Sequence, residues 1–175
     1  MKKRWMLFIV IIGSVGLLAD FVYDEFYRNP DQLFSSLRLL KYFTIQSNIV
    51  LVSYFWIMYA LKLDKRSDFF KHYIGSVVIC SFITFSMFAI FLESIHDPEG
   101  LGLVGSISLH YIVPLLSLSF LLYYRKDYYF KFKHIPKWTI FPLVYLLFAV
   151  IHGLITDDYL YPFLDINSIG ILGLF

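Results

Sequence analysis

The sequence has few of the residues that build soluble or disulfide-bonded domains. Only 16% of its 175 residues are charged, and its single cysteine, Cys80, cannot form an internal disulfide. Glycine (9 residues) and proline (6 residues) are too scarce for a collagen-like chain. The net charge of +2 is too small to indicate a nucleic-acid partner. No glycine-rich phosphate loop is present, which argues against nucleotide chemistry.

Apolar and aromatic side chains are abundant instead. Hydrophobic residues make up 59% of the chain and aromatic residues 21%, and the mean hydropathy is +0.69. This composition is far more apolar than a soluble domain tolerates, and the many Phe and Tyr residues also exclude a disordered chain. The sequence therefore predicts an integral membrane protein.

Five apolar stretches approach the roughly 20 residues that a helix needs to cross a bilayer. The expected spans are Trp5–Tyr23, Tyr42–Leu63, Phe69–Leu92, Ser106–Tyr124 and Trp138–Thr156. The first is expected to stay uncleaved, because no small-residue cleavage pattern follows it. The tail Ile166–Phe175 is too short to cross and is either an interfacial foot or the start of an incomplete sixth span. The predicted fold is an all-α polytopic bundle, with residues 1–175 in one transmembrane domain.

Charged residues are unevenly divided between the two sides of the predicted spans. Twelve of the fifteen Lys and Arg residues fall on the side of the N terminus, and ten of the thirteen acidic residues fall on the other side. By the positive-inside rule, the N terminus is expected in the cytoplasm and the region around Tyr161 outside.

Polar residues within the predicted spans gather in one layer, the extracytoplasmic half of the membrane. Their positions are informative because polar groups are costly inside a bilayer. This layer holds Asp20 on the first span, Thr44, Gln46, Ser47 and Asn48 on the second, Glu93 on the third, His110 on the fourth and His152 on the fifth. The other histidines, His72, His96 and His134, lie in loops or at span ends and are expected to be solvated.

The spacing of these residues places several of them on the same face of a helix. Thr44, Ser47 and Asn48 are three and four residues apart, so they share one face of the second span. On the fourth span, Pro114 cannot donate to the carbonyl of His110, and a kink is expected there. A kinked, polar helix face often borders a cavity, although Ser, Thr and Asn also serve as hydrogen-bonding groups between membrane helices.

A hydroxyl beside an imidazole is the minimal pair of nucleophile and base, because the imidazole accepts the proton that the hydroxyl must lose. Thr44 and His110 meet this description in residue type and in depth. Stabilising the oxyanion requires hydrogen-bond donors, for which Asn48, Gln46 or the free amides at a helix start are candidates.

Other interpretations remain open at this point. His110, His152 and Glu93, with Asp20 nearby, form a candidate zinc site that would hold an activated water. No two of these residues have a metal-binding spacing on one helix. A non-catalytic pocket for a lipid or small molecule, or a proton-sensitive channel element, would use the same groups. Asp20 and Glu93 also have a simpler explanation, in which each carboxylate reaches the outer interface.

Three short segments occur in a distinctive order: residues 42–48 (YFTIQSN), 110–114 (HYIVP) and 161–165 (YPFLD). In this order, on a small multispan scaffold, they resemble the bacterial Pr6Pr-type membrane proteins, relatives of the androgen-induced protein 1 family. Animal members of that family are intramembrane threonine hydrolases that cleave fatty acid esters of hydroxy fatty acids with one Thr and one His. The resemblance assigns these roles to Thr44 and His110. It implies a bacterial plasma membrane protein and supplies no acidic third member.

The sequence thus leads to one main expectation, an intramembrane hydrolase of lipid-like esters. Thr44 is the expected nucleophile and His110 the expected base, in a cavity in the outer half of the membrane. Residues expected to support the site or bind substrate are Gln46, Ser47, Asn48, His152, Asp20 and Glu93. The expected partners are a lipid substrate and membrane lipids, with no cofactor.

Overall fold

The protein is all-helical in the residues that its computed structural model describes, which are 1–62, 68–128, 131–165 and 167. Four helical segments are long and apolar enough to cross a membrane: Lys2–Arg28, Phe43–Leu61, Phe70–Ile95 and Gly100–Tyr123. They coincide with the first four predicted spans to within a few residues at most ends. The expected class, an all-α integral membrane protein, is confirmed at this level.

The fifth predicted span is shorter and is interrupted near its start. Its main part is α7 (Ile140–Thr156), a helix of 17 residues, and the single turn α6 (Ile135–Trp138) precedes it. Seventeen residues rise about 26 Å, slightly less than the roughly 30 Å of a hydrocarbon core. The fifth crossing therefore stays a prediction. The expected foot or sixth span at 166–175 lies outside the described residues, apart from Asn167.

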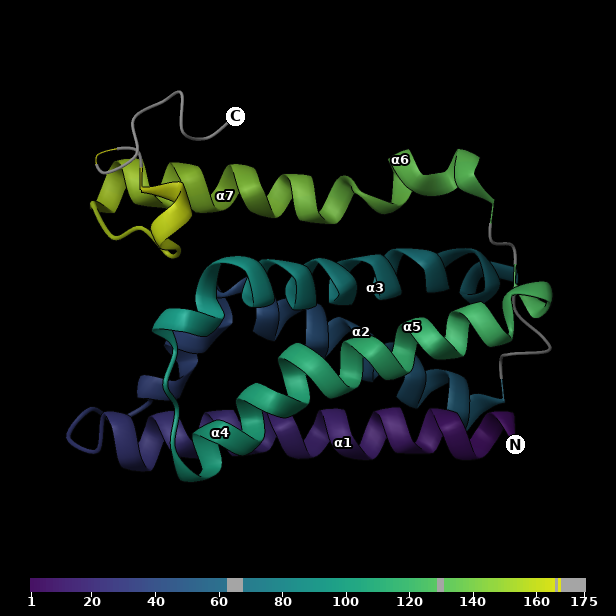
Figure 1. Ribbon diagram of the computed structural model, residues 1–175, viewed down its shortest axis with the longest axis horizontal. Helices are drawn as coiled ribbons and strands as arrows, with labels where there is room; N and C mark the ends of the chain where they lie inside the picture. The colour runs from purple at the N-terminus through teal and green to yellow at the C-terminus, as the bar shows by residue number, and fades with distance from the viewer. Residues whose placement is uncertain (63–67, 129–130, 166, 168–175) are drawn as a thin grey trace.

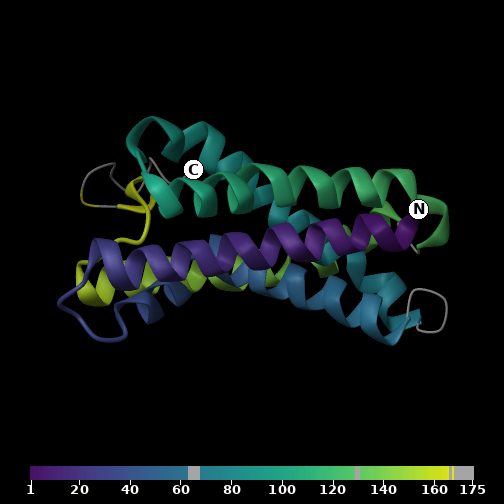
Figure 2. The same ribbon diagram turned by 90° about the horizontal axis from the view of Figure 1, so that it is seen from below.

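The helices lie side by side in layers along one long axis (Figure 1). The main elements are α1 (Lys2–Tyr23), α2 (Phe43–Leu61), α3 (Asp68–Met87), α4 (Gly100–Ile107) and α5 (Val113–Tyr123). In Figure 1, α1 borders one side of the molecule and α7 the opposite side, with α2, α3 and α5 between them. Figure 2 shows the same helices from below, with the connecting loops at the two ends of the bundle.

An apolar core fills the half of the bundle that contains the N terminus. Its largest fully buried side chains include Phe55 late in α2, Phe120 late in α5 and Met6 early in α1. The rings of Phe55 and Phe120 meet edge to face, with centroids 5.2 Å apart. Aromatic pairs prefer this geometry, so the two rings join α2 and α5 within the core. Buried polar side chains such as Asn48, Thr84 and His110 lie outside this cluster.

Ion pairs connect the loops at each end of the bundle. Lys2 Nζ lies 3.0 Å from Asp127 Oδ2, which joins the N terminus to the loop after α5. Lys41 Nζ lies 3.3 Å from Asp158 Oδ2 at the opposite end. Loops expected on the same side of the membrane thus lie at the same end of the molecule. Which end faces the cytoplasm stays a prediction.

Candidate active site

Three π-helical turns lie at the end of the bundle opposite the N terminus. They are Asp24–Arg28 after α1, Phe88–Leu92 after α3, and Ser108–Ile112 between α4 and α5. A π turn inserts one residue into a helix and changes the direction of the side chains beyond it, often at a functional site. The third turn lies directly before Pro114, in the region where the sequence predicts a kink. Each of the three turns contributes side chains to the same cavity.

Thr44 and His110 meet inside this part of the bundle. Thr44 lies in the first turn of α2, His110 lies in the π turn Ser108–Ile112, and Thr44 Oγ1 is 3.3 Å from His110 Nε2. The predicted pair is therefore in contact, although 66 residues separate its members. His110 is buried, with 9% of its surface exposed.

The other ring nitrogen of His110 determines which tautomer the ring adopts. His110 Nδ1 is 3.0 Å from the carbonyl oxygen of Ser106 and 3.3 Å from the Ser106 hydroxyl. Because a carbonyl oxygen can only accept a hydrogen bond, Nδ1 carries the proton and donates it. Nε2 is then unprotonated and accepts the hydrogen bond from the Thr44 hydroxyl. This is the arrangement that a general base requires.

The plane of the His110 ring is fixed by an aromatic neighbour. Phe88, in the π turn after α3, stacks on the imidazole with ring centroids 3.8 Å apart and an interplanar angle of 21°. The ring is thus held on one face by Phe88 and at both nitrogens by hydrogen bonds. Rotation away from Thr44 would break all of these contacts.

Close packing of α1 against the third π turn sets the depth of His110. A Cβ atom on Gly16 would lie 2.7 Å from Ser108 Cβ and 3.0 Å from Leu109 Cδ2. A Cβ atom on Gly105 would lie 3.0 Å from Asp20 Cβ. Only glycine permits so close an approach of two membrane helices, as in other small-residue interfaces.

Asn48 and Ser47 hold the start of α2 in place and do not line the cavity. Asn48 Nδ2 donates to the carbonyl of Thr44 (2.8 Å) and to that of Leu109 (3.2 Å), so one side chain connects the segments that carry the pair. Ser47 Oγ is 2.8 Å from Thr84 Oγ1 on α3. Both Asn48 and Ser47 are fully buried. Their role in this arrangement is to position Thr44.

Gln46 points away from the pair, as its spacing predicts. Its amide Nε2 donates to the carbonyl of Leu40 at 2.8 Å, in the segment before α2. Tyr161, from the third motif segment, instead reaches the start of α2, where its hydroxyl accepts a hydrogen bond of 2.9 Å from the amide of Phe43. Tyr161 thus satisfies one of the amides that a helix start leaves unpaired.

A cavity of about 250 Å³ opens at the Thr44 and His110 pair, and we call it the polar cavity. Its acidic, basic and histidine lining residues besides His110 are Asp20, Arg28 and His96. Glu93 is solvent-exposed and does not line it. Asp20 is thus the one acidic candidate that the structure brings to the pair's cavity, among the residues described.

His96 was expected to be solvated, and the structure shows it half-buried. It follows α3 in the loop before α4, where it lines the polar cavity and contacts Phe88 edge-on, with ring centroids 5.5 Å apart. Its ring centroid is 6.2 Å from that of His110. Burial lowers the pKa of His96, and the charge of Arg28 lowers it further. No periodic pattern in the loop identifies this residue from sequence.

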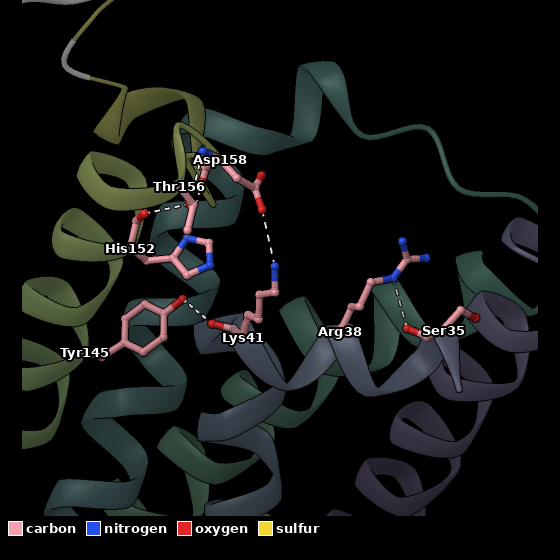
Figure 3. A network of polar contacts seen from close by, with 7 residues as sticks. All are labelled: Ser35, Arg38, Lys41, Tyr145, His152, Thr156 and Asp158. Carbon is pink, nitrogen blue, oxygen red and sulfur yellow. Dashed lines mark hydrogen bonds and ion pairs between the residues drawn. The ribbon is translucent and has the colours of Figure 1, made fainter. Parts of the chain in front are cut away.

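His152 belongs to a different group of contacts, near the C-terminal end of α7 (Figure 3). Its Nδ1 is 3.0 Å from the carbonyl oxygen of Asp158, and its own carbonyl accepts from Thr156 Oγ1 at 2.7 Å. The Tyr145 hydroxyl donates to the carbonyl of Lys41 at 2.7 Å, and Lys41 pairs with Asp158. Together these contacts connect α7 to the segment before α2. His152 does not line the polar cavity.

The residues of the alternative zinc site are not brought together. Within residues 1–62, 68–128, 131–165 and 167, no three His, Cys, Asp or Glu side chains are close enough to hold a metal ion. His110 has its nitrogens engaged by Thr44 and Ser106, while His152 is bonded near Asp158.

Comparisons of the chain with protein-family models, with curated proteins and with solved structures find no match.

Proposed function

We propose that the protein is an intramembrane hydrolase of fatty acyl esters, with Thr44 as nucleophile and His110 as general base. The observation that carries this proposal is the 3.3 Å contact between Thr44 Oγ1 and His110 Nε2, in a ring whose Nδ1 donates to the Ser106 carbonyl. The resemblance to the androgen-induced protein 1 family supports the same assignment of roles. The pair also borders a cavity large enough to admit a reacting group.

The first half of the reaction transfers the acyl group to Thr44. Thr44 Oγ1 attacks the ester carbonyl carbon while His110 Nε2 takes the hydroxyl proton. The tetrahedral intermediate then collapses, the bond to the alcohol oxygen breaks, and the His110 imidazolium returns its proton to that oxygen. The products of this half are a free alcohol and an acyl ester on Thr44.

The start of α2 supplies electrostatic support for this step. Thr44 is the second residue of α2, and the amides of a first helical turn have no acceptor within the helix. These amides and the positive end of the helix dipole favour negative charge near Thr44. The Phe43 amide already donates to the Tyr161 hydroxyl, so the other amides of this turn are the candidate donors for the oxyanion. The side-chain amides of Asn48 and Gln46 are bonded to carbonyls.

The second half of the reaction is hydrolysis of the acyl-enzyme. His110 Nε2 accepts a proton from a water molecule, whose oxygen attacks the acyl carbonyl. The bond to Thr44 Oγ1 breaks, the hydroxyl regains its proton from His110, and a fatty acid is released. Water reaches the pair through the polar cavity, which is lined by Asp20, Arg28 and His96.

The proposal includes an orientation in the membrane. With the N terminus in the cytoplasm of a bacterial cell, the pair lies in the extracytoplasmic half of the plasma membrane. The polar cavity then faces the outer leaflet, and lipids of that leaflet are the available substrates. The division of basic residues between the two ends supports this orientation.

The proposal is tested by turnover of a long-chain ester by four purified proteins: wild type, Thr44→Ala, His110→Ala and the double variant. Because hydroxyl and imidazole act as one unit, all three variants should fall to a similar residual rate. Thr44→Ser is the matched control and should retain measurable turnover, because it keeps the hydroxyl. Near wild-type turnover by Thr44→Ala would instead favour a non-catalytic lipid-binding protein or another mechanism.

A further inference from the structure

A second cavity, of about 220 Å³, reaches the pair from the side of α7, and we call it the apolar groove. Its walls come from α2, α3 and α7 and from the segment after α7. Typical lining residues are Ile83, Met87, Leu143, Leu146 and Leu164. Leu143 and Leu146 are partly exposed on α7, so the groove extends to the surface of the bundle.

The apolar groove and the polar cavity meet at Thr44. Four residues line both of them: Thr44, Phe88, Leu92 and Tyr161. Thr44 thus borders both cavities, and so does Phe88, which stacks on His110. A molecule bound across this boundary would extend into both cavities with its central bond at the nucleophile.

The two cavities differ sharply in the polarity of their linings. Asp20, Arg28 and His96 line the polar cavity, whereas the described lining of the apolar groove includes no Asp, Glu, Lys, Arg or His. The groove also contains hydroxyl groups, but most are already bonded to the protein.

Apart from Thr44, three hydroxyl-bearing residues line the groove. Thr84 Oγ1 is 2.8 Å from Ser47 Oγ, Tyr145 donates to the Lys41 carbonyl at 2.7 Å, and Tyr161 accepts from the Phe43 amide at 2.9 Å. The groove therefore presents an apolar surface that ends at one reactive hydroxyl, that of Thr44.

We infer that the substrate is an ester of a long acyl chain with a small polar alcohol, as in a monoacylglycerol. This inference rests on the function proposed above. The acyl chain lies in the apolar groove, the carbonyl carbon lies at Thr44, and the alcohol lies in the polar cavity. When the ester bond breaks, the alcohol takes the proton from His110 and leaves toward the polar cavity. The acyl group remains in the groove on Thr44 until water releases it as a fatty acid.

The groove selects its ligand by shape more than by affinity. An acyl chain that enters from the bilayer gains little hydrophobic free energy, because lipid tails are as apolar as the groove. The effect of the groove should thus appear in which end of an ester reaches Thr44. A chain on the alcohol side would have to fill the cavity that contains Arg28 and Asp20, at the cost of desolvating their charges.

The first test compares two esters that differ in the position of the long chain. In detergent-solubilised protein, monopalmitoylglycerol should be hydrolysed in a Thr44-dependent reaction, and cetyl acetate should be hydrolysed at least roughly tenfold more slowly, as kcat/KM. Equal, Thr44-dependent rates for the two esters would overturn the assignment of the cavities while leaving the hydrolase function intact.

A matched pair of variants tests the groove itself. Leu146→Trp adds bulk at a lining position, and Leu147→Trp adds the same bulk at the neighbouring position of α7, which does not line the groove. Leu146→Trp should lower kcat/KM for monopalmitoylglycerol by roughly tenfold and should change kcat/KM for monoacetylglycerol by no more than about twofold. Leu147→Trp should leave kcat/KM for both esters unchanged. Retained turnover of the short ester shows that the variant is folded. Equal effects of the two Trp variants would contradict the inference.

A binding experiment separates this inference from the catalytic proposal. Thr44→Ala protein is irradiated with palmitic acid that carries a terminal diazirine, and the cross-linked peptides are identified by mass spectrometry. Labels should fall on residues of α3 and α7 that line the groove, and Leu146→Trp should reduce them. If wild type hydrolyses no ester but these labels appear, the proposed function is wrong and the apolar groove is still the binding site of an acyl chain. Labels confined to other surfaces would overturn the groove as an acyl site.

Discussion

His110 is held by a main-chain carbonyl where many hydrolases use a carboxylate. The Ser106 oxygen, 3.0 Å from Nδ1, fixes the tautomer, and Phe88 fixes the plane of the ring. A carbonyl dipole stabilises an imidazolium less than a full negative charge does. The imidazolium formed during catalysis therefore needs compensating charge from another group, and Asp20 in the same cavity is a candidate.

Esterase activity is expected to fall as the pH is lowered, because a protonated His110 cannot accept the proton of Thr44. The neutral ring is the active form, so the loss occurs on the acid side of the profile. The measurement is kcat against pH with monopalmitoylglycerol, with Thr44→Ala as background. A flat profile from acid to alkaline pH, together with an inactive His110→Ala protein, would mean that His110 is structural.

At the level of helices, the sequence predicts which residues share a layer but not how they turn toward each other. Thr44 and His110 were identified because polar groups inside a bilayer are rare, and membrane depth follows directly from position within a span. The π turns escape this reasoning, since one inserted residue changes neither length nor composition noticeably. They bring Arg28 and Phe88 into the cavity, and sequence reasoning missed both. His96 was missed because loop residues carry no periodic signal.

Asn48 connects two of these elements, and its replacement should impair catalysis more than binding. Asn48→Leu removes the hydrogen bonds to the carbonyls of Thr44 and Leu109. Since each such bond contributes about 0.5–1.5 kcal/mol, the expected cost in stability is about 1–3 kcal/mol. We expect kcat to fall by roughly tenfold or more, because catalysis is sensitive to displacements of about 1 Å, and KM to change little.

The control for this variant is Val50→Leu, at an exposed position on the same helix. It should leave kcat and thermal stability near the wild-type values. If Asn48→Leu keeps full kcat while its melting temperature falls, then Asn48 contributes to folding alone and does not position the pair.

At the scale of the whole molecule, composition and hydropathy were sufficient to predict the class and four of the long helices. They were insufficient for the fifth span, because Thr139 separates α6 from α7 and shortens the continuous helix to 17 residues. His152 illustrates a related limit. Its position in the fifth predicted span placed it at the membrane depth of the polar layer. In the structure, its hydrogen bonds connect α7 to the loop at Asp158. Depth alone cannot distinguish a residue that faces the cavity from one that faces a neighbouring loop.

Membrane orientation is open to a direct test with single-cysteine probes. In a Cys80→Ala background, Glu99→Cys should react with a membrane-impermeant maleimide in intact cells, because basic residues concentrate at the other end. Lys133→Cys should react only after the membrane is permeabilised. Both side chains are exposed, so access to the reagent is limited by the membrane alone. The reverse pattern would move the pair to the cytoplasmic half of the bilayer.

The central claim, that Thr44 is a nucleophile activated by His110, is tested most directly by mass spectrometry after treatment with a fluorophosphonate. The reagent loses fluoride to an activated hydroxyl and leaves a stable phosphonyl group on that oxygen. We expect the label on Thr44 in wild type and in Ser47→Ala, and no label in Thr44→Ala or His110→Ala. A label on Ser47 or on another hydroxyl, or a label that persists in Thr44→Ala, would contradict the claim.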